Sequence, residues 1–260
     1  MNPETFATVD GEGPPLVLVH GVGLDHTMWD RVLDSLGASR RVIRYDLLGH
    51  GQTPDPPGPR TLEDFVVQLL TVLDAHRLDR ADVAGLSLGG MVALAAAARH
   101  PDRFDRLALL NTVFERSPEQ VETALRRMAI AESEGMAAVA DLAVDRWFST
   151  QWQAEHPAQV DQVRRRLADT DPVGYLKAYR VFIAGDPLLP EGATAVTAVT
   201  LAMTGELDPG STPAMSRALA TAVSGGQVRI LAGLHHLPPV EEPSTFAGAL
   251  LEFFDREATS

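Results

Sequence analysis

Short apolar runs rich in valine, isoleucine and leucine alternate along the chain with longer stretches whose apolar residues recur at helical spacing. Continuous apolar runs of this length are typical of strands that are buried on both faces of a sheet. The runs occupy 16–19, 41–45, the stretch that ends at Ala84, 106–111, 199–203 and 227–231. Helical spacing is found in 28–36, 62–76, 90–98, 213–222 and 243–256. This alternation predicts an α/β fold in which a parallel sheet is covered on both faces by helices.

Residues 115–190 break the alternation and contain no convincing strand. Because the strand–helix pattern resumes afterwards, we interpret 115–190 as a helical insertion and not as an independent domain. The predicted organisation is a core made of 1–114 and 191–260, with the insertion placed before the strand at 199–203. Within the insertion, apolar spacing predicts three helices, at 118–134, 136–148 and 158–167.

The pentapeptide Gly85-Leu86-Ser87-Leu88-Gly89 fits the pattern G-x-S-x-G and lies between a predicted strand and a predicted helix. A strand that turns sharply into a helix through this pattern is a nucleophile elbow, which exposes the serine hydroxyl. The turn brings strand and helix so close that a Cβ atom at position 85 or 89 would clash. We therefore predict that Ser87 is a nucleophile; the alternative is a tight turn without a catalytic role.

A serine nucleophile needs a base and an acid that orients the base, and both are expected where later strands end. The strand at 199–203 is followed by Glu206 and Asp208. We favour Asp208 as the acid because it lies in the turn that the next two residues, proline and glycine, close. An acid after the preceding strand would be an alternative arrangement, but Asn111 occupies that position.

The last predicted strand leads to two adjacent histidines, His235 and His236, which gives the order Ser…Asp…His expected for an elbow serine. Neighbours on an extended loop point in opposite directions, so only one of them can be the base. Adjacent histidines do not converge on one ion, and no H-E-x-x-H motif occurs, so we expect no metal site. We expect ordinary surface or capping roles for the histidines at positions 26, 50, 76, 100 and 156.

The oxyanion of a tetrahedral intermediate needs two backbone N–H donors. The Leu88 amide, directly after the nucleophile, is the first candidate. The second is expected from the glycine-rich turn at 20–23, most simply the Val22 amide. A glycine turn with no catalytic part is the alternative. We expect His20 to hold this turn by hydrogen bonds and not to act as an acid or base.

The amino-acid composition argues against several kinds of binding partner and against a membrane location. The 260 residues include 22 lysines and arginines against 35 aspartates and glutamates, and the net charge of −13 argues against nucleic acid as a partner. Cysteine is absent, which excludes disulfides and thiolate metal sites. The longest apolar run, 91–98, is far shorter than the roughly 20 residues of a membrane span. Residues 1–4 do not resemble a signal peptide, so we expect a cytoplasmic protein without membrane contact.

The motifs together resemble the α/β-hydrolase superfamily over nearly the whole chain. This resemblance implies an α/β-hydrolase fold with a helical cap inserted before the acid-bearing strand, and a triad of Ser87, Asp208 and His236, with His236 chosen over His235. The motifs are His20-Gly21, Asp46-x-x-Gly49-x-Gly51, Gly85-x-Ser87-x-Gly89-Gly90, Gly205-Glu206-x-Asp208 and His236-x-Pro238-x-x-Glu241-x-Pro243. Within the superfamily, the chain is most similar to the 3-oxoadipate enol-lactonase group, in stretches at 23–29, 44–46, 86–92, 110–112, 146–148 and 171–175.

The resemblance implies acyl transfer on a small-molecule ester or lactone, a reaction that needs no cofactor. If the substrate is an anionic enol-lactone, a protein of net charge −13 must supply local positive charge. Arg146 beside Trp147 is the first candidate for substrate contact, and Lys177 (the single lysine) or Arg180 is the second. The alternatives are a general carboxylesterase, a carbon–carbon bond hydrolase with the same triad, and a binding protein without activity. No pattern in the chain specifies an oligomeric state.

Overall fold

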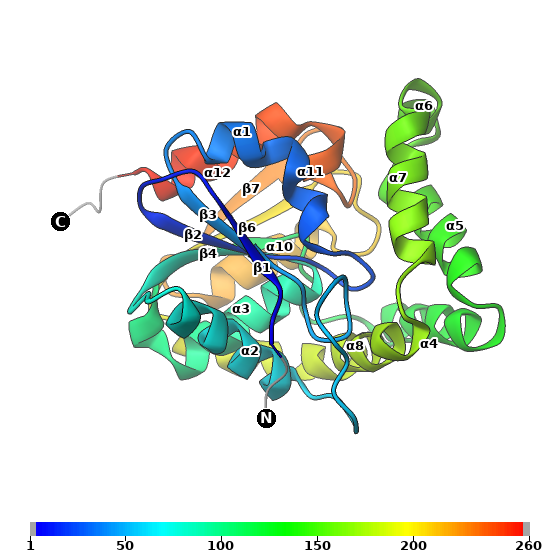
Figure 1. Cartoon of the computed structure of the whole chain (residues 1–260), viewed down its shortest axis with the longest axis horizontal. Coiled ribbons are helices and arrows are strands. Elements are labelled where there is room, and N and C mark those ends of the chain that lie inside the picture. Colours follow the sequence, from blue (N-terminus) through cyan, green and yellow to red (C-terminus); the bar gives the residue numbers. More distant parts are fainter. Residues whose placement is uncertain (1–3, 257–260) are drawn as a thin grey trace.

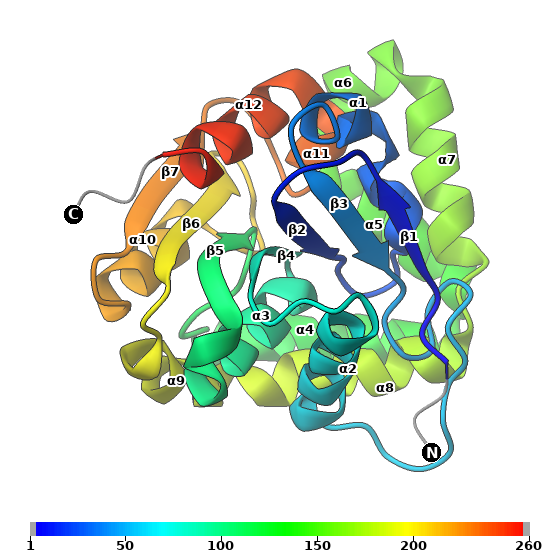
Figure 2. The same ribbon diagram turned by 60° about the vertical axis from the view of Figure 1, so that its left-hand side comes forward.

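The computed structural model describes residues 4–256 and contains a central seven-stranded sheet (Figure 1 and Figure 2). The strands lie in the order β1-β3-β2-β4-β5-β6-β7, with β1 antiparallel to β3 and every other pair parallel. The predicted mostly parallel α/β fold is confirmed. The apolar pattern does not predict β1, an edge strand without a fully buried side chain. The strands are β1 (Ala7–Asp10), β2 (Pro15–Val19), β3 (Arg41–Tyr45), β4 (Ala81–Leu86), β5 (Phe104–Leu110), β6 (Val199–Gly205) and β7 (Gln227–Leu231).

Helices cover both faces of this sheet, as the alternating pattern predicts (Figure 1). The helix expected at 28–36 is a 3₁₀ helix up to residue 32, and only its last four residues are α-helical. One face carries η1 (His26–Val32), α1 (Leu33–Leu36), α11 (Pro238–Glu241) and α12 (Pro243–Phe254). The other face carries α2 (Leu62–Ala75), α3 (Leu88–Arg99), the short η2 (Pro101–Arg103), α9 (Leu189–Ala195) and α10 (Pro213–Ala222).

The chain between β5 and β6 contains the predicted helical insertion, whose helices lie at one side of the sheet (Figure 1). Its helices are α4 (Pro118–Ser133), α5 (Met136–Trp147), α6 (Thr150–Glu155), α7 (Pro157–Ala168) and α8 (Pro172–Gly185), followed by η3 (Asp186–Leu188). The three predicted helices correspond to α4, α5 and α7, whereas α6 and α8 are not predicted. Apolar residues such as Val173 also occupy the exposed side of α8, so no single apolar stripe marks this helix.

The division into a core and an insertion stays a prediction, and its second boundary falls inside α9. This helix packs against α3, which belongs to the core. Within the described residues, no helix combines the length and the apolar character that crossing a bilayer requires.

The turn between β4 and α3 is packed too tightly for side chains at its glycines. A Cβ atom on Gly85 would lie 2.2 Å from the carbonyl oxygen of Gly89, and one on Gly89 would lie 2.2 Å from that of Val19. Both neighbours are backbone atoms, which cannot move aside without displacing a helix or a strand. The predicted clash at positions 85 and 89 is confirmed, and the contact ties α3 to β2 as well as to β4.

We expect Gly89→Ala to lower the free energy of unfolding by about 2 kcal/mol or more, because its Cβ atom would force α3 away from the end of β2. Gly248 in α12 provides the matched control, since a Cβ atom there meets nothing within 4 Å. Gly248→Ala should raise the free energy of unfolding by about 0.5–1 kcal/mol, because alanine is the better helix former. Urea unfolding measures both values. A Gly89→Ala variant as stable as the wild type would contradict the close approach of α3 to β2.

Candidate active site

Ser87 joins β4 to α3 in a backbone conformation that residues with side chains rarely adopt. Its φ is 56° and its ψ is −114°, and such conformations cost of the order of 1–3 kcal/mol. The Ser87 amide donates to the Leu110 carbonyl at 2.8 Å, and the Ser87 carbonyl accepts from the Gly90 amide at 3.0 Å. These bonds hold the strained residue between β5 and α3. The geometry is that of a sharp strand–turn–helix elbow.

A cavity of about 210 Å³ adjoins Ser87 and is lined by residues of both the core and the insertion. The core contributes Gly21, Val22, Ser87 and His236. The insertion contributes mainly charged and aromatic side chains, among them Arg116, Arg127, Arg146, Trp147, Tyr175, Tyr179 and Phe182. The structure therefore brings two of the three predicted triad residues to one cavity, under side chains of the insertion.

The side chains of His236 and Asp208, which follow β7 and β6, are hydrogen bonded to each other. Nδ1 of His236 lies 2.7 Å from Oδ2 of Asp208. A proton on Nδ1 leaves the Nε2 lone pair free, which is the tautomer that a general base requires. The other carboxylate oxygen, Oδ1, accepts from the amides of Gly210 at 2.8 Å and Ser211 at 3.0 Å. The buried carboxylate thus has donors on both oxygens, and it fixes the orientation of the imidazole ring.

Asn111, directly after β5, is a site residue that we did not assign from the sequence. Its Nδ2 atom lies 2.8 Å from Oδ2 of Asp208, 3.1 Å from Oγ1 of Thr204 and 3.1 Å from the His235 carbonyl oxygen. Burial raises the pKa of Asp208, but the charge of His236 and hydrogen bonds from His236, Asn111 and a backbone amide outweigh burial and lower it. The sequence signal that could have identified Asn111 as a site residue is its position at the carboxyl end of a predicted parallel strand.

Glu241 in α11 holds the opposite side of the loop that carries His236. Its Oε2 accepts from the His235 amide at 2.8 Å. The residue before His236 is therefore bound through its carbonyl by Asn111 and through its amide by Glu241. Burial raises the pKa of Glu241 to about 8, and the negative charge of Asp208 acts in the same direction. Glu241 is therefore largely protonated at neutral pH.

The amides of Leu88 and Val22 are available to a ligand at the elbow. Leu88 is the first residue of α3, and Val22 lines the cavity from the turn after β2. Among residues 4–256, neither amide has a hydrogen-bond acceptor. Free amides at a helix N-terminus attract negative charge. Their role as oxyanion donors stays a prediction.

His20 holds the turn after β2, in the structural role expected of it. Its Nε2 accepts from the Leu47 amide at 2.9 Å, and its Nδ1 donates to the Gly21 carbonyl at 2.8 Å. Burial lowers the pKa of His20, which keeps the ring neutral for this pair of bonds. The expectation of a surface or capping role is wrong for His50, which is buried with its ring centroid 5.4 Å from that of His20. Burial lowers the pKa of His50 to about 3.

Three arginines of the insertion line the cavity and differ in how their charge is balanced. Arg116 is paired with Asp186, with Nε 3.5 Å from Oδ2. In the described part of the chain, no carboxylate lies within 4.0 Å of the guanidinium groups of Arg127 or Arg146. Nε of Arg127 donates to the Tyr179 hydroxyl at 3.0 Å. Burial, and then the charge of Arg127, lower the pKa of Arg146. Two cationic groups therefore border the cavity without a carboxylate at ion-pair distance, although Glu119 also lines the cavity.

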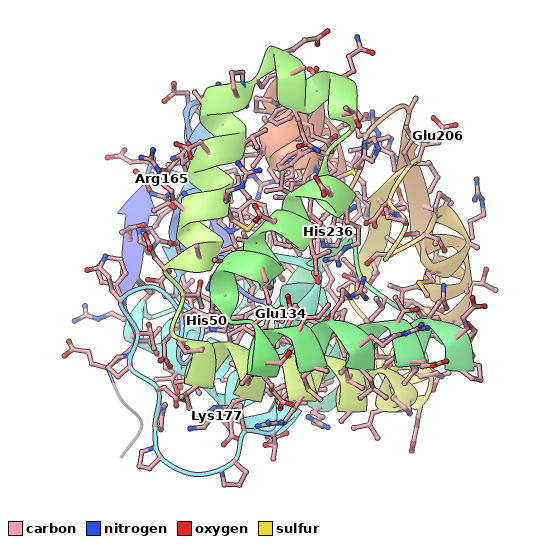
Figure 3. All side chains as sticks on the ribbon, turned by 90° about the vertical axis from the view of Figure 1, so that its right-hand side faces the viewer. His50, Glu134, Arg165, Lys177, Glu206 and His236 are labelled. Carbon is pink, nitrogen blue, oxygen red and sulfur yellow. The ribbon has the colours of Figure 1, made fainter. Side chains whose placement is uncertain are left out.

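Lys177 and Arg180 do not line this cavity, which corrects the expectation that they contact the substrate. Nζ of Lys177 lies 2.6 Å from Oδ2 of Asp55, in the loop after β3 and away from His236 (Figure 3). Arg180 is exposed and pairs with Glu132 at 2.8 Å. Both side chains are neutralised within the protein, so neither supplies charge to a ligand in the cavity.

Glu206, the alternative acid, also lies apart from His236 (Figure 3). Its carboxylate is exposed and accepts from the Gly233 amide at 2.9 Å. Between residues 4 and 256, no three histidine, aspartate or glutamate side chains converge closely enough to hold a metal ion.

We expect Glu241→Gln to change how stability depends on pH. The carboxyl group binds its proton more tightly in the folded state, with a pKa of about 8, than in the unfolded state, with an ordinary value of 4.5. The stability from this proton is complete below pH 4.5 and is lost as pH rises through 8. Between pH 5.5 and 8.5, the wild type should lose about 3 kcal/mol of unfolding free energy relative to the variant.

Urea unfolding at the two pH values measures this difference. The exposed Glu134 serves as the control (Figure 3), and for Glu134→Gln we expect an offset from the wild type that is the same at both pH values. If the offset for Glu241→Gln were equally constant, burial would not raise the pKa of the Glu241 carboxyl group.

Comparison with known proteins places this geometry in a family. The family model for the alpha/beta hydrolase fold matches residues 14–243. (E)-2-((N-methylformamido)methylene)succinate hydrolase of Acinetobacter baylyi is 30% identical, over 90% of this chain and 87% of that protein. 3-Oxoadipate enol-lactonase 1 of the same organism is 28% identical, over 90% and 85%. The crystal structure of the enol-lactonase from Burkholderia xenovorans LB400 has a TM-score of 0.90 at 33% identity, covering 98% of this chain and 97% of that one. The chain therefore belongs to the alpha/beta hydrolase family.

Proposed function

We propose that this alpha/beta hydrolase opens a carboxylate-bearing enol-lactone by forming an acyl-enzyme on Ser87. One observation carries the proposal: the strained Ser87 elbow and the hydrogen-bonded His236–Asp208 pair meet at one cavity. A serine hydroxyl is a weak nucleophile, and this pair supplies the base and the orienting carboxylate that it needs.

In the first half of the reaction, Oγ of Ser87 attacks the carbonyl carbon while its proton passes to Nε2 of His236. The hydrogen bond between these two atoms forms with substrate bound, since such bonds are often long in free enzymes. The amides of Val22 and Leu88 receive the negative charge that develops on the carbonyl oxygen. Collapse of the intermediate breaks the carbon–oxygen bond of the ring, and His236 gives its proton to the departing oxygen.

In the second half, water replaces the leaving group. His236 removes a proton from the water molecule as its oxygen attacks the acyl carbon, and the same two amides hold the second oxyanion. Collapse releases the acid and returns the proton to Oγ of Ser87. Asp208 keeps its charge throughout, because its low pKa leaves it ionised, and it stabilises the imidazolium that forms twice in each turnover.

Charge and relatives together support an anionic lactone as the substrate. Arg127 and Arg146 are partly buried at the cavity and have no carboxylate within 4.0 Å, so a substrate anion would supply the missing counter-charge. Two of the similar proteins are named enol-lactonases and match nearly the whole chain. We infer that the substrate carboxylate binds at Arg146 while its reacting carbonyl lies against Ser87.

A fluorophosphonate probe, which reacts with activated serines, tests the nucleophile. We expect complete labelling of the wild type and no labelling of Ser87→Ala, because Ser87 lies on the strained elbow at the cavity that His236 also lines. The substrate class is tested by turnover of 3-oxoadipate enol-lactone, for which kcat/KM should exceed that for short aryl esters by about tenfold or more. A wild type that stays unlabelled would rule out a serine mechanism. Efficient turnover of aryl esters without opening of the lactone would contradict the proposed lactonase activity and support a general esterase.

Arg146→Ala tests the charge recognition. Losing a hydrogen bond to a charged group costs about 1.5–3 kcal/mol, so kcat/KM for the anionic lactone should fall by about 10- to 100-fold, mainly through KM. For a neutral aryl ester it should change by no more than about threefold. Arg180→Ala is the matched control, because this arginine lies nearby in sequence but pairs with Glu132 outside the cavity. If Arg146→Ala lowered kcat/KM equally for both substrates, Arg146 would not bind the substrate carboxylate.

A further inference from the structure

Trp147, the last residue of α5, touches the predicted base. Its ring is stacked on that of His236, with the centroids 5.7 Å apart and the planes inclined by 23°. The side chain is 5% exposed and lines the cavity. The two residues come from different parts of the fold, since α5 belongs to the insertion and His236 follows β7. The insertion therefore contacts the imidazole ring as well as covering the cavity.

The geometry suits an interaction between an aromatic face and a cation. Aromatic pairs are favourable with centroids 4.5–7 Å apart, and a cation is attracted to an indole face within about 6 Å of its centroid. The His236–Trp147 distance satisfies both conditions. Asp208 binds Nδ1 at the edge of the same imidazole ring. His236 thus has one partner for its ring plane and another for its ring edge.

The charge on His236 changes during the proposed reaction. The ring is neutral before attack and becomes an imidazolium when it takes the Ser87 proton. The indole face carries negative electrostatic potential, so its attraction for the ring increases as the positive charge develops. An interaction that is stronger in the transition state than in the substrate complex raises kcat and leaves KM nearly unchanged.

We propose that Trp147 is a positioning residue for the base: it holds the His236 ring by stacking and stabilises the imidazolium through the indole face. This inference rests on the proposed function and revises the expectation that Trp147 contacts the substrate. Arg146 borders the same indole ring, with Cζ 5.8 Å from its centroid. The reaction is therefore best followed with a neutral aryl ester, which leaves carboxylate binding at Arg146 out of the comparison.

The chain offers a matched control in Trp152. This residue also lies in the insertion, is 9% exposed and stacks on a histidine, His156, with centroids 4.4 Å apart and planes inclined by 15°. Trp152 does not line the cavity. Replacing it removes a stack on a histidine, together with a second stack on Phe148, without touching His236.

Steady-state kinetics of three variants separate the roles. Trp147→Leu should lower kcat about tenfold with KM within about twofold, because the lost attraction acts on the transition state. Trp147→Phe keeps an aromatic face and should retain kcat to within about threefold. Trp152→Leu should leave kcat within about twofold of the wild type. Rates are divided by the fraction of protein that reacts with fluorophosphonate, so misfolded protein is not counted.

Fluorinated tryptophan at position 147 tests the electrostatic part in a protein of unchanged shape. Fluorine withdraws charge from the indole face, so kcat should fall stepwise from one to three fluorines, by about threefold in total. The same series at position 152 should give a constant kcat. This measurement applies even where Trp147→Leu does not fold.

Two outcomes overturn the inference. A raised KM with unchanged kcat in Trp147→Leu would show that Trp147 contacts substrate, and a constant kcat across the fluorinated series would show that the ring contributes packing alone. Ser87→Ala, measured in parallel, distinguishes these failures from failure of the proposed function. Turnover that survives in Ser87→Ala contradicts the serine mechanism itself. Turnover that is lost in Ser87→Ala but unchanged in the Trp147 variants contradicts only the role of Trp147.

Discussion

The site depends on a backbone-to-backbone approach that only glycine permits. Gly85 in β4 packs against the carbonyl oxygen of Gly89 in α3, and Gly89 packs against that of Val19 at the end of β2. This approach leaves Ser87 in a conformation with positive φ, and the surrounding buried sheet supports the strain. The same approach brings the turn after β2 to Ser87, since a Cβ atom on Gly21 would lie 3.2 Å from Cβ of Ser87. One packing constraint therefore places both the hydroxyl and the turn beside it.

Two buried carboxyl groups near the end of the sheet then adopt opposite states. Asp208 receives four hydrogen bonds and keeps its charge, whereas Glu241 receives one from a backbone amide and holds a proton at neutral pH. Two ionised carboxylates so close would repel each other and weaken the hold of Asp208 on His236. A neutral Glu241 still binds the loop before His236 without adding a second negative charge. Asn111 completes this arrangement by connecting β5 to the ends of β6 and β7.

Local patterns explain why the core could be predicted from sequence and the insertion only in part. The elbow, the buried strands and the loops after them each follow from a few consecutive residues, so Ser87, Asp208 and His236 can be predicted as a triad without the structure. The roles of Lys177 and Arg180 depend on Asp55 and Glu132, which are 122 and 48 residues away, and no local pattern reveals such partners. Asn111 and the stack of Trp147 on His236 are missed for the same reason, because each is defined by contacts between different elements.

The insertion carries the charges that distinguish this cavity from the rest of an acidic protein. With a net charge of −13, the surface repels anions at long range, so an anionic substrate must be recognised at close range by desolvated groups. Under the proposed function, Arg127 and Arg146 meet this requirement, because they line the cavity and no carboxylate of the described chain lies within 4.0 Å of either guanidinium group. Arg146 also shares the indole ring of Trp147 with His236. A carboxylate that binds Arg146 would neutralise a positive charge next to the indole ring that stacks on His236. Under the proposed function, binding of the substrate carboxylate at Arg146 therefore favours protonation of His236.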